Sequence, residues 1–278
     1  MKVAGFLAAL AALFGIGALA GGLLDPSAPG GETAAAGTGH GGGMATMRPM
    51  PVRGLAVAEN GLRLVVATPE LRRGRTGELR FRVLDARDRA VRAFDLEHTK
   101  RMHVIVVRRD LVGFQHLHPT MAADGTWSVP LRVADAGSYR LLADFSHDGT
   151  PVTLGSDLRV DGAADLVPLP APAPTAVSDG YAVRLDAPPG RAGEEGALRF
   201  TVTRDGRPVA TEPYLGAGGH LVALRAGDLA FLHVHPVEAR GDTIAFEATF
   251  PTAGAYRLFL QFRADGRVHT VAFTQEVR

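Results

Sequence analysis

Six histidines recur in two matched sets of three, and they are the side chains in this chain best suited to chemistry. The segments 103–119 and 220–236 read HVIVVRRDLVGFQHLHP and HLVALRAGDLAFLHVHP. Their histidines are His103, His116 and His118 in the first set and His220, His233 and His235 in the second. Three imidazoles on adjacent strands suit copper, zinc or nickel. The pattern therefore predicts one metal site per segment.

Whether the first histidine of each set joins the other two depends on strand register. The two histidines of each His-x-His run share a face, because strand side chains alternate. In an antiparallel hairpin, His103 joins that face when the connecting loop has an even number of residues. A two-residue turn at Ala226-Gly227 meets this condition in the second set and pairs His220 with His233. We therefore expect the imidazole nitrogens of the first set to lie within about 3–5 Å of each other.

Other potential ligands flank these sets. His98 lies five residues before His103, has no counterpart in the second set, and is a candidate fourth ligand in the first. His147 and His269 occupy unmatched positions, and we expect both to be exposed. For all the histidines the alternative is a structural role, in which a ring nitrogen only bonds a backbone carbonyl.

A methionine-rich segment precedes the first set. His40 is followed by Met44, Met47 and Met50. Thioethers are soft ligands that favour Cu(I), so this segment is a candidate for capturing that ion. The alternative is a plain flexible tether, because the segment is rich in glycine and has no apolar period.

The histidine sets belong to a longer internal repeat. The same offset, from 103 to 220, relates all three histidines, and it persists from AGSYRL at 136–141 to AGAYRL at 253–258. Each repeat contains short runs rich in β-branched and aromatic residues, separated by turn dipeptides such as Asp148-Gly149. We predict an all-β fold of two tandem immunoglobulin-like β-sandwich domains, after an N-terminal transmembrane or signal segment.

The strands of the first repeat can be placed individually. We expect them at 62–66, 79–84, 103–107, 114–118, 127–133 and 139–145. The stretch from Asp135 to Leu141 resembles the D-x-G-x-Y-x-C stretch of immunoglobulin domains, with leucine in place of cysteine. We therefore predict structural roles for Tyr139 and Tyr256, and a core position for Trp127.

Changes in composition along the chain indicate separate segments, and the first of these predicts that the rest of the chain lies outside the cytoplasm. We expect residues 1–24 to form a signal anchor or signal peptide, since 22 uncharged residues follow Lys2 and are enough to span a bilayer. We expect a single-pass membrane protein with an extracytoplasmic C-terminal part, or a secreted protein if the chain is cleaved after Ala20. The expected order is then a disordered Gly/Met/His linker at 25–53, repeat 1 at 54–162, a Pro-rich linker at 163–177 and repeat 2 at 178–278.

Charge and cysteine content narrow the function. The net charge is +1 and there is no cysteine. We expect no nucleic-acid partner, and disulfides, thiolate metal sites and a lipoprotein anchor are excluded. We predict that the chain is not an enzyme. Two-domain copper monooxygenases also use His-x-His on β-sandwiches, but they carry disulfides. The sequence leaves any protein partner open.

The segment from Arg101-Met102-His103 to His116-Leu117-His118-Pro119 resembles secreted or membrane-anchored bacterial proteins, common in actinobacteria, with YtkA-like or copper-resistance-like immunoglobulin-type domains. The resemblance covers both repeats and implies an exported immunoglobulin-type fold associated with copper. Two functions stay open. One is a membrane-tethered extracytoplasmic metal-binding protein, for copper handling. The other is a non-catalytic extracellular interaction module whose histidines are structural.

Overall fold

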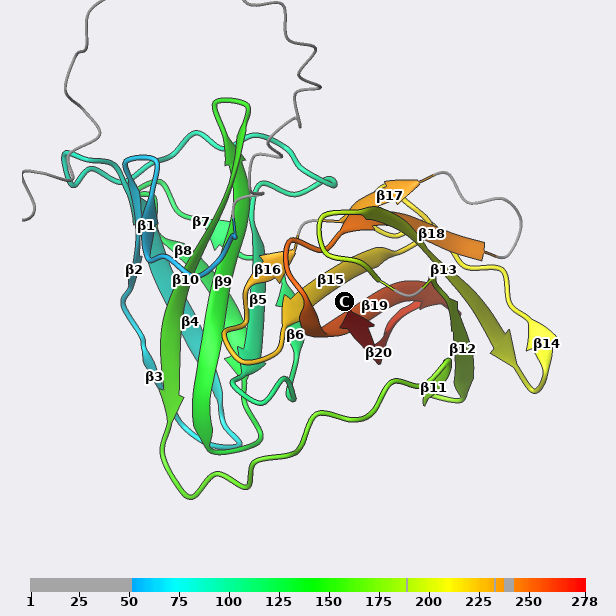
Figure 1. The fold of residues 1–278 in the computed structure, drawn as a ribbon. Helices are drawn as coiled ribbons and strands as arrows, with labels where there is room; N and C mark the ends of the chain where they lie inside the picture. Colours follow the sequence, from blue (N-terminus) through cyan, green and yellow to red (C-terminus); the bar gives the residue numbers. More distant parts are fainter. Residues whose placement is uncertain (1–51, 189, 233, 238–242) are drawn as a thin grey trace, which may run out of the picture. The chain divides into compact units, whose positions relative to one another are not determined.

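The computed structural model describes residues 52–188, 190–232, 234–237 and 243–278. All regular structure in these residues is β (Figure 1). Among them, we find no helix that is both long enough and apolar enough to cross a bilayer. The predicted anchor at 1–24 and the potential ligands His40, Met44, Met47 and Met50 lie outside the described residues.

The first repeat consists of two five-stranded sheets. One sheet has the order β1 (Ala58–Glu59), β2 (Leu62–Val66), β4 (Thr76–Leu84), β8 (Trp127–Arg132), β7 (Thr120–Met121). The other has the order β3 (Glu70–Leu71), β10 (Thr150–Val160), β9 (Gly137–His147), β5 (His103–Arg108), β6 (Gln115–Leu117). β3 runs parallel to β10, and the other neighbours are antiparallel.

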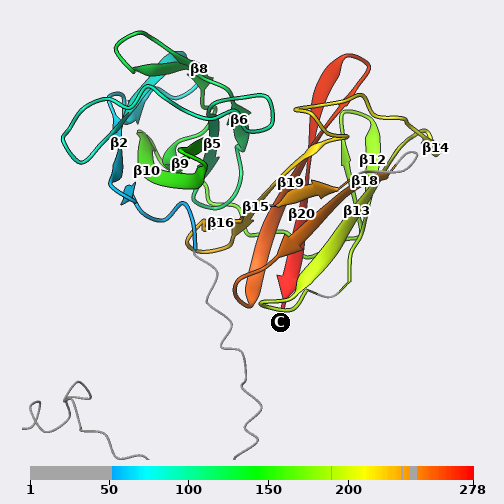
Figure 2. The same ribbon diagram turned by 90° about the horizontal axis from the view of Figure 1, so that it is seen from above.

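The second repeat has a similar strand order, but its second sheet has four strands where that of the first repeat has five (Figure 2). Its first sheet has the order β11 (Thr175–Ser178), β12 (Tyr181–Asp186), β13 (Glu195–Arg204), β18 (Thr243–Thr249), β17 (His235–Val237), with β14 (Arg207–Pro208) beside β13. Its second sheet has the order β16 (Phe231–Leu232), β15 (His220–Arg225), β19 (Gly254–Ala264), β20 (Arg267–Val277). β11 lies in the segment predicted as linker, because its pairing with β12 starts at Thr175.

Alternating burial explains why these segments form strands. In β2, Leu62 and Leu64 are buried while Arg63 is exposed, as expected of a strand that covers a core on one face. Trp127 is 3% exposed and stacks against Phe81 with ring centroids 6.5 Å apart, so the predicted core position is confirmed. All six predicted strands of the first repeat are present, with ends that differ by up to three residues.

The β9–β10 hairpin, drawn in green in Figure 1, shows how a turn fixes the register. Asp148 and Gly149 have φ angles of 50° and 72°, so both adopt the left-handed conformation. A two-residue turn of this kind matches the twist of the flanking strands. It pairs His147 with Thr150, and the antiparallel pairing continues to the other end of both strands.

A tyrosine corner closes each sandwich. The Tyr139 hydroxyl donates a hydrogen bond to the Asp135 carbonyl oxygen at 2.8 Å, and the Tyr256 hydroxyl donates to the Thr252 carbonyl oxygen at 3.0 Å. Both rings are about 1% exposed. A tyrosine at the start of this strand that bonds a few residues upstream is a hallmark of immunoglobulin sandwiches. The structural role predicted for both tyrosines is confirmed.

We expect Tyr139→Phe to lower the free energy of unfolding by about 1 kcal/mol, because the Asp135 carbonyl loses its buried donor while the ring stays packed. Chemical denaturation of the full chain measures this change. Ser138→Ala, a change at the exposed neighbour, serves as the control. Equal stability of Tyr139→Phe and the unaltered protein would show that the hydrogen bond contributes nothing.

Candidate metal centre

The first histidine set lies on one face of the β5–β6 hairpin. The two strands pair Ile105 with His116 and Val104 with Leu117. This register sets His103 opposite His118, so all three imidazoles share the face of Ile105. Val104 packs into the core of the sandwich instead. The predicted convergence of the first set is confirmed.

The turn predicted for the second set has the wrong length, although the number of residues in the loop is even, as predicted. Ala223 pairs with Leu232 and Leu224 with Phe231, two residues out of the predicted register, and His235 lies on β17, which pairs with β18 in the other sheet. The loop has four residues, because the Asp228 carboxylate bonds the guanidinium of Arg225 and accepts a hydrogen bond from the Ala230 amide. Residue 233 and the side chain of His235 lie outside the described part of the structure.

The three imidazoles of the first set form a compact group. Each offers one ring nitrogen, and these nitrogens lie within 4.8 Å of one another. His103 Nδ1 and His116 Nε2 are 3.0 Å apart. Two nitrogens bound to one ion at about 2.0–2.1 Å, at angles of about 90–110°, are about 2.9–3.4 Å apart. The spacing of this pair therefore fits two ligands of one ion.

Hydrogen bonds at the outer edges of the rings fix which nitrogens carry protons. His103 Nε2 lies 3.1 Å from the Glu97 carbonyl oxygen, and His116 Nδ1 lies 2.7 Å from Gln261 Oε1. Both oxygens only accept, so both nitrogens donate. A neutral imidazole has one N–H, which leaves His103 Nδ1 and His116 Nε2 as lone pairs facing each other. Facing lone pairs repel each other unless a cation lies between them.

Burial disfavours a proton in that position. Burial, together with the neighbouring His103 and His118, lowers the pKa of His116 to about 3. Burial also lowers the pKa of His103 and brings that of His118 to about 4. The Nε2 of His118 is buried and has no hydrogen-bond partner. At neutral pH the group is thus a set of uncharged imidazoles with free nitrogens, the form that binds metals.

Two polar partners of this group were not predicted. Gln261 lies on β19 and fixes the tautomer of His116, and Asp144 lies on β9 directly opposite His103. Asp144 is bonded to Thr153 and Gln261 to Thr270, so these pairs occupy equivalent positions of the two repeats. The only available signal was a polar residue within an apolar strand at matched positions, which the internal alignment could have revealed.

The remaining histidines lie at different distances from the first set. The ring of His98 lies 6.2 Å from that of His103, farther than the other members of the first set. His147 is half-buried, and its Nδ1 donates to the Ala93 carbonyl oxygen at 2.9 Å. The prediction that His269 is exposed is wrong. It is 7% exposed on β20, bonded to Asp179 and packed against the ring of Tyr181.

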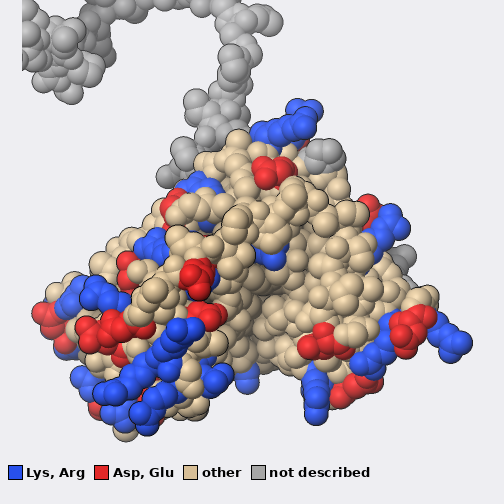
Figure 3. Space-filling model, turned by 90° about the horizontal axis from the view of Figure 1, so that it is seen from below, with Lys and Arg blue, Asp and Glu red and all other residues tan. Residues whose placement is uncertain are grey.

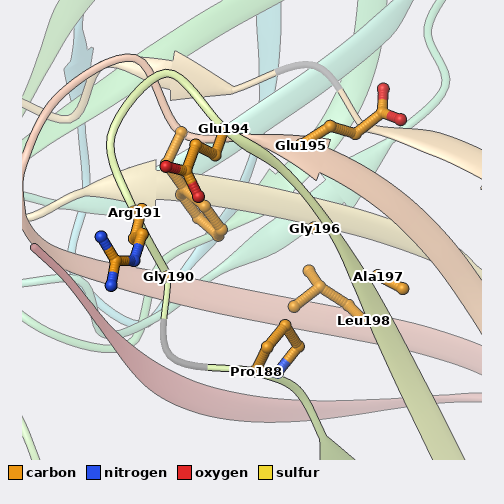
Figure 4. A pocket seen from close by; sticks show the side chains of 9 residues that line it. Pro188, Gly190, Arg191, Glu194, Glu195, Gly196, Ala197 and Leu198 are labelled. Carbon is orange, nitrogen blue, oxygen red and sulfur yellow. The ribbon is translucent and has the colours of Figure 1, made fainter.

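Surface hollows differ in their relation to the histidines, since one has His118 in its lining and another has His269. The hollow in Figure 4 is lined by Pro188, Phe250 and the start of β13, and none of its lining residues is a histidine. On the face that Figure 3 displays, Lys and Arg side chains are interspersed with Asp and Glu. This mixture of signs is typical of a solvated surface.

Strand order and tyrosine corners define two immunoglobulin-like sandwiches, the first of which holds a three-histidine group with His103 buried and His116 and His118 partly buried. The chain belongs to the family described as "Domain of unknown function (DUF8832)", whose model matches residues 57–162 and again 175–278. Both histidine sets lie within the matched residues. No curated protein matches the chain.

Among solved structures, the chain is similar to the Escherichia coli adhesin FdeC, with 14% identity over 80% of this chain and 66% of that one, and a TM-score of 0.27. It is also similar to InvD of Yersinia pseudotuberculosis, with 13% identity over 78% of this chain and 58% of that one, and a TM-score of 0.25. The chain thus spans less than two thirds of either relative. Scores this low give no ground for transferring a function.

Proposed function

We propose that this protein binds a transition-metal ion through His103, His116 and His118, and that it is a membrane-tethered, extracytoplasmic protein of copper handling. The observation that carries the proposal is the 3.0 Å approach of two unprotonated nitrogens, His103 Nδ1 and His116 Nε2. An ion between them turns a repulsive contact into two coordinate bonds.

The chemistry of the ligands supports copper, with zinc or nickel as the other ions that imidazoles suit. The ligating rings are already oriented by Glu97 and Gln261, the kind of outer hydrogen bonds that metal-bound histidines typically make. The extracytoplasmic location rests on the uncharged segment near the N-terminus. The Met-rich segment before the first repeat would favour Cu(I), and the histidines would take Cu(II).

The alternative is a non-catalytic extracellular interaction module whose histidines are structural. The Glu97 and Gln261 hydrogen bonds are of the kind that structural histidines also make. The buried, unpartnered Nε2 of His118 favours the metal, because an unsatisfied buried nitrogen costs stability in a purely structural role.

Metal loading of the full chain tests the proposal. After equilibration with Cu(II), Zn(II) or Ni(II) and removal of free ion, we expect a stoichiometric amount of at least one of these ions in the folded protein. Cu(II) is used because thioethers favour Cu(I), so the methionines should contribute little to the ion that is retained. A correctly folded protein that retains none of the three ions refutes the metal-binding function and leaves the interaction module.

A further inference from the structure

The two sandwiches contact each other through equivalent faces. An apolar cluster combines Ile105, Val107, Leu111 and Leu142 of the first repeat with Val222, Leu224, Leu229, Phe231 and Phe259 of the second. Ile105 matches Val222, Val107 matches Leu224 and Leu142 matches Phe259 under the offset that relates the histidines. The two repeats thus meet as two copies of one surface, as in a symmetric dimer.

Individual ring contacts join the two repeats. The rings of Phe114 and Phe259 stack with centroids 4.0 Å apart and planes 7° apart. Equivalent residues touch each other only near such an axis. His103 and His220 are equivalent, and their rings lie 5.6 Å apart with planes at 7°. The axis therefore passes close to the histidines.

His220 consequently lies against the first histidine set. Its ring centroid is 4.6 Å from that of His116. Its Nδ1 is buried without a hydrogen-bond partner, and its strand neighbour on β19 is Gln261, which bonds His116. His220 thus offers an unpartnered buried nitrogen beside the first set.

Ring spacings distinguish His220 from His98 as a fourth ligand. An imidazole bound at about 2.0–2.1 Å has its ring centre about 3.2 Å from the ion, so two such ligands have ring centres about 4.5–5.2 Å apart. The first set has spacings of 5.2, 5.0 and 4.7 Å, and His116–His220 has 4.6 Å, whereas His103–His220 has 5.6 Å, which corresponds to a wider angle of about 120° at the ion. The nitrogens that lie within 4.8 Å of one another do not include one of His220, so the His220 ring would have to move toward the ion on binding. His98 lies 6.2 Å from His103 and 5.8 Å from His220.

We propose that His220 is the fourth ligand of the ion held by His103, His116 and His118, so that the two repeats share one metal site and the ion links them. The inference rests on the proposed function and deepens it. Structural metal sites with four protein ligands stabilise the fold that brings the ligands together. Here the ion would stabilise the contact between the sandwiches, with Gln261 and His220 supplied by the second repeat.

A cysteine placed at 220 tests direct ligation, because the chain has no other cysteine. Loaded with Co(II), the full-length His220→Cys variant should gain a near-ultraviolet thiolate-to-cobalt absorption band. His147→Cys, away from the cluster, should bind Co(II) as the unaltered protein does and show no band. If His220→Cys retains Co(II) without this band, His220 is not a ligand and the shared site is wrong.

A measurement on the unaltered protein covers the case in which His220→Cys does not fold. Nitrogen couplings in the electron paramagnetic resonance spectrum of the Cu(II)-loaded chain should indicate four imidazoles, and three would overturn the inference. His220→Ala should weaken Cu(II) binding by on the order of tenfold or more, and unchanged affinity would also overturn it. Absence of any bound ion refutes the proposed function itself, so the two failures are distinguishable.

Discussion

His118→Ala is expected to weaken metal binding by on the order of 100-fold or more while leaving the metal-free protein folded. Loss of an outer hydrogen-bond partner of a ligand already costs about 10- to 100-fold in affinity, and loss of the ligand itself costs at least as much. His118 is the most informative choice because its Nε2 has no hydrogen-bond partner to lose. Its removal therefore leaves no newly unsatisfied partner.

The measurement is a Cu(II) titration of the full chain, paired with thermal unfolding in the presence and absence of the ion. An ion at 100 times its dissociation constant stabilises the unaltered protein by about 2.7 kcal/mol, and this stabilisation should disappear in His118→Ala. His147→Ala is the matched control, since His147 lies outside the cluster. If His118→Ala binds Cu(II) like the unaltered protein, His118 is not a ligand.

The second large effect is a loss of stability of the metal-free protein in acid. His116 has a pKa of about 3 in the folded chain, against about 6.5 when unfolded. Below pH 6.5 the unfolded chain therefore binds a proton that the folded chain excludes, so stability falls as pH falls. The slope approaches about 1.4 kcal/mol per pH unit for each such imidazole and persists down to the folded-state pKa.

Neighbouring groups also contribute to the dependence of stability on pH. His220 contributes in the same direction as His116, because burial lowers its pKa too. His118 contributes less, because it is partly open to solvent. Asp144 contributes in the opposite direction. Burial raises its pKa, so the folded chain binds this proton at a higher pH than the unfolded chain does. The positive charge of Lys100 nearby also favours neutral imidazoles.

Denaturant unfolding of the metal-free chain between pH 7 and 4.5 measures the effect. We expect a loss of several kcal/mol over this range, a large part of the stability of a typical domain. His116→Gln should show a shallower slope, because it removes one of the protons involved. A free energy of unfolding that is flat from pH 7 to 5 would show that the cluster is not buried as a set of neutral rings.

The local features of the fold are encoded in the sequence. Alternating apolar residues and turn dipeptides predicted the strands of the first repeat, because burial on one face and left-handed turn residues are encoded locally. The repeat offset predicted two copies of one fold, and the tyrosine motif predicted the corners at Tyr139 and Tyr256. Loop parity predicted that His103 joins His116 and His118, and even an incorrect turn length preserved that result.

Tertiary structure decided how the histidine sets relate to each other. Spacing within each repeat suggested separate sites, because a repeat seen alone gives no information about which face it buries against the other. Ile105 and Val107 are as apolar as Val104 and Val106, so sequence cannot tell core from contact face. Packing of equivalent apolar faces brings His220 and Gln261 to His116. The partners of the cluster are therefore set by long-range contacts between the repeats.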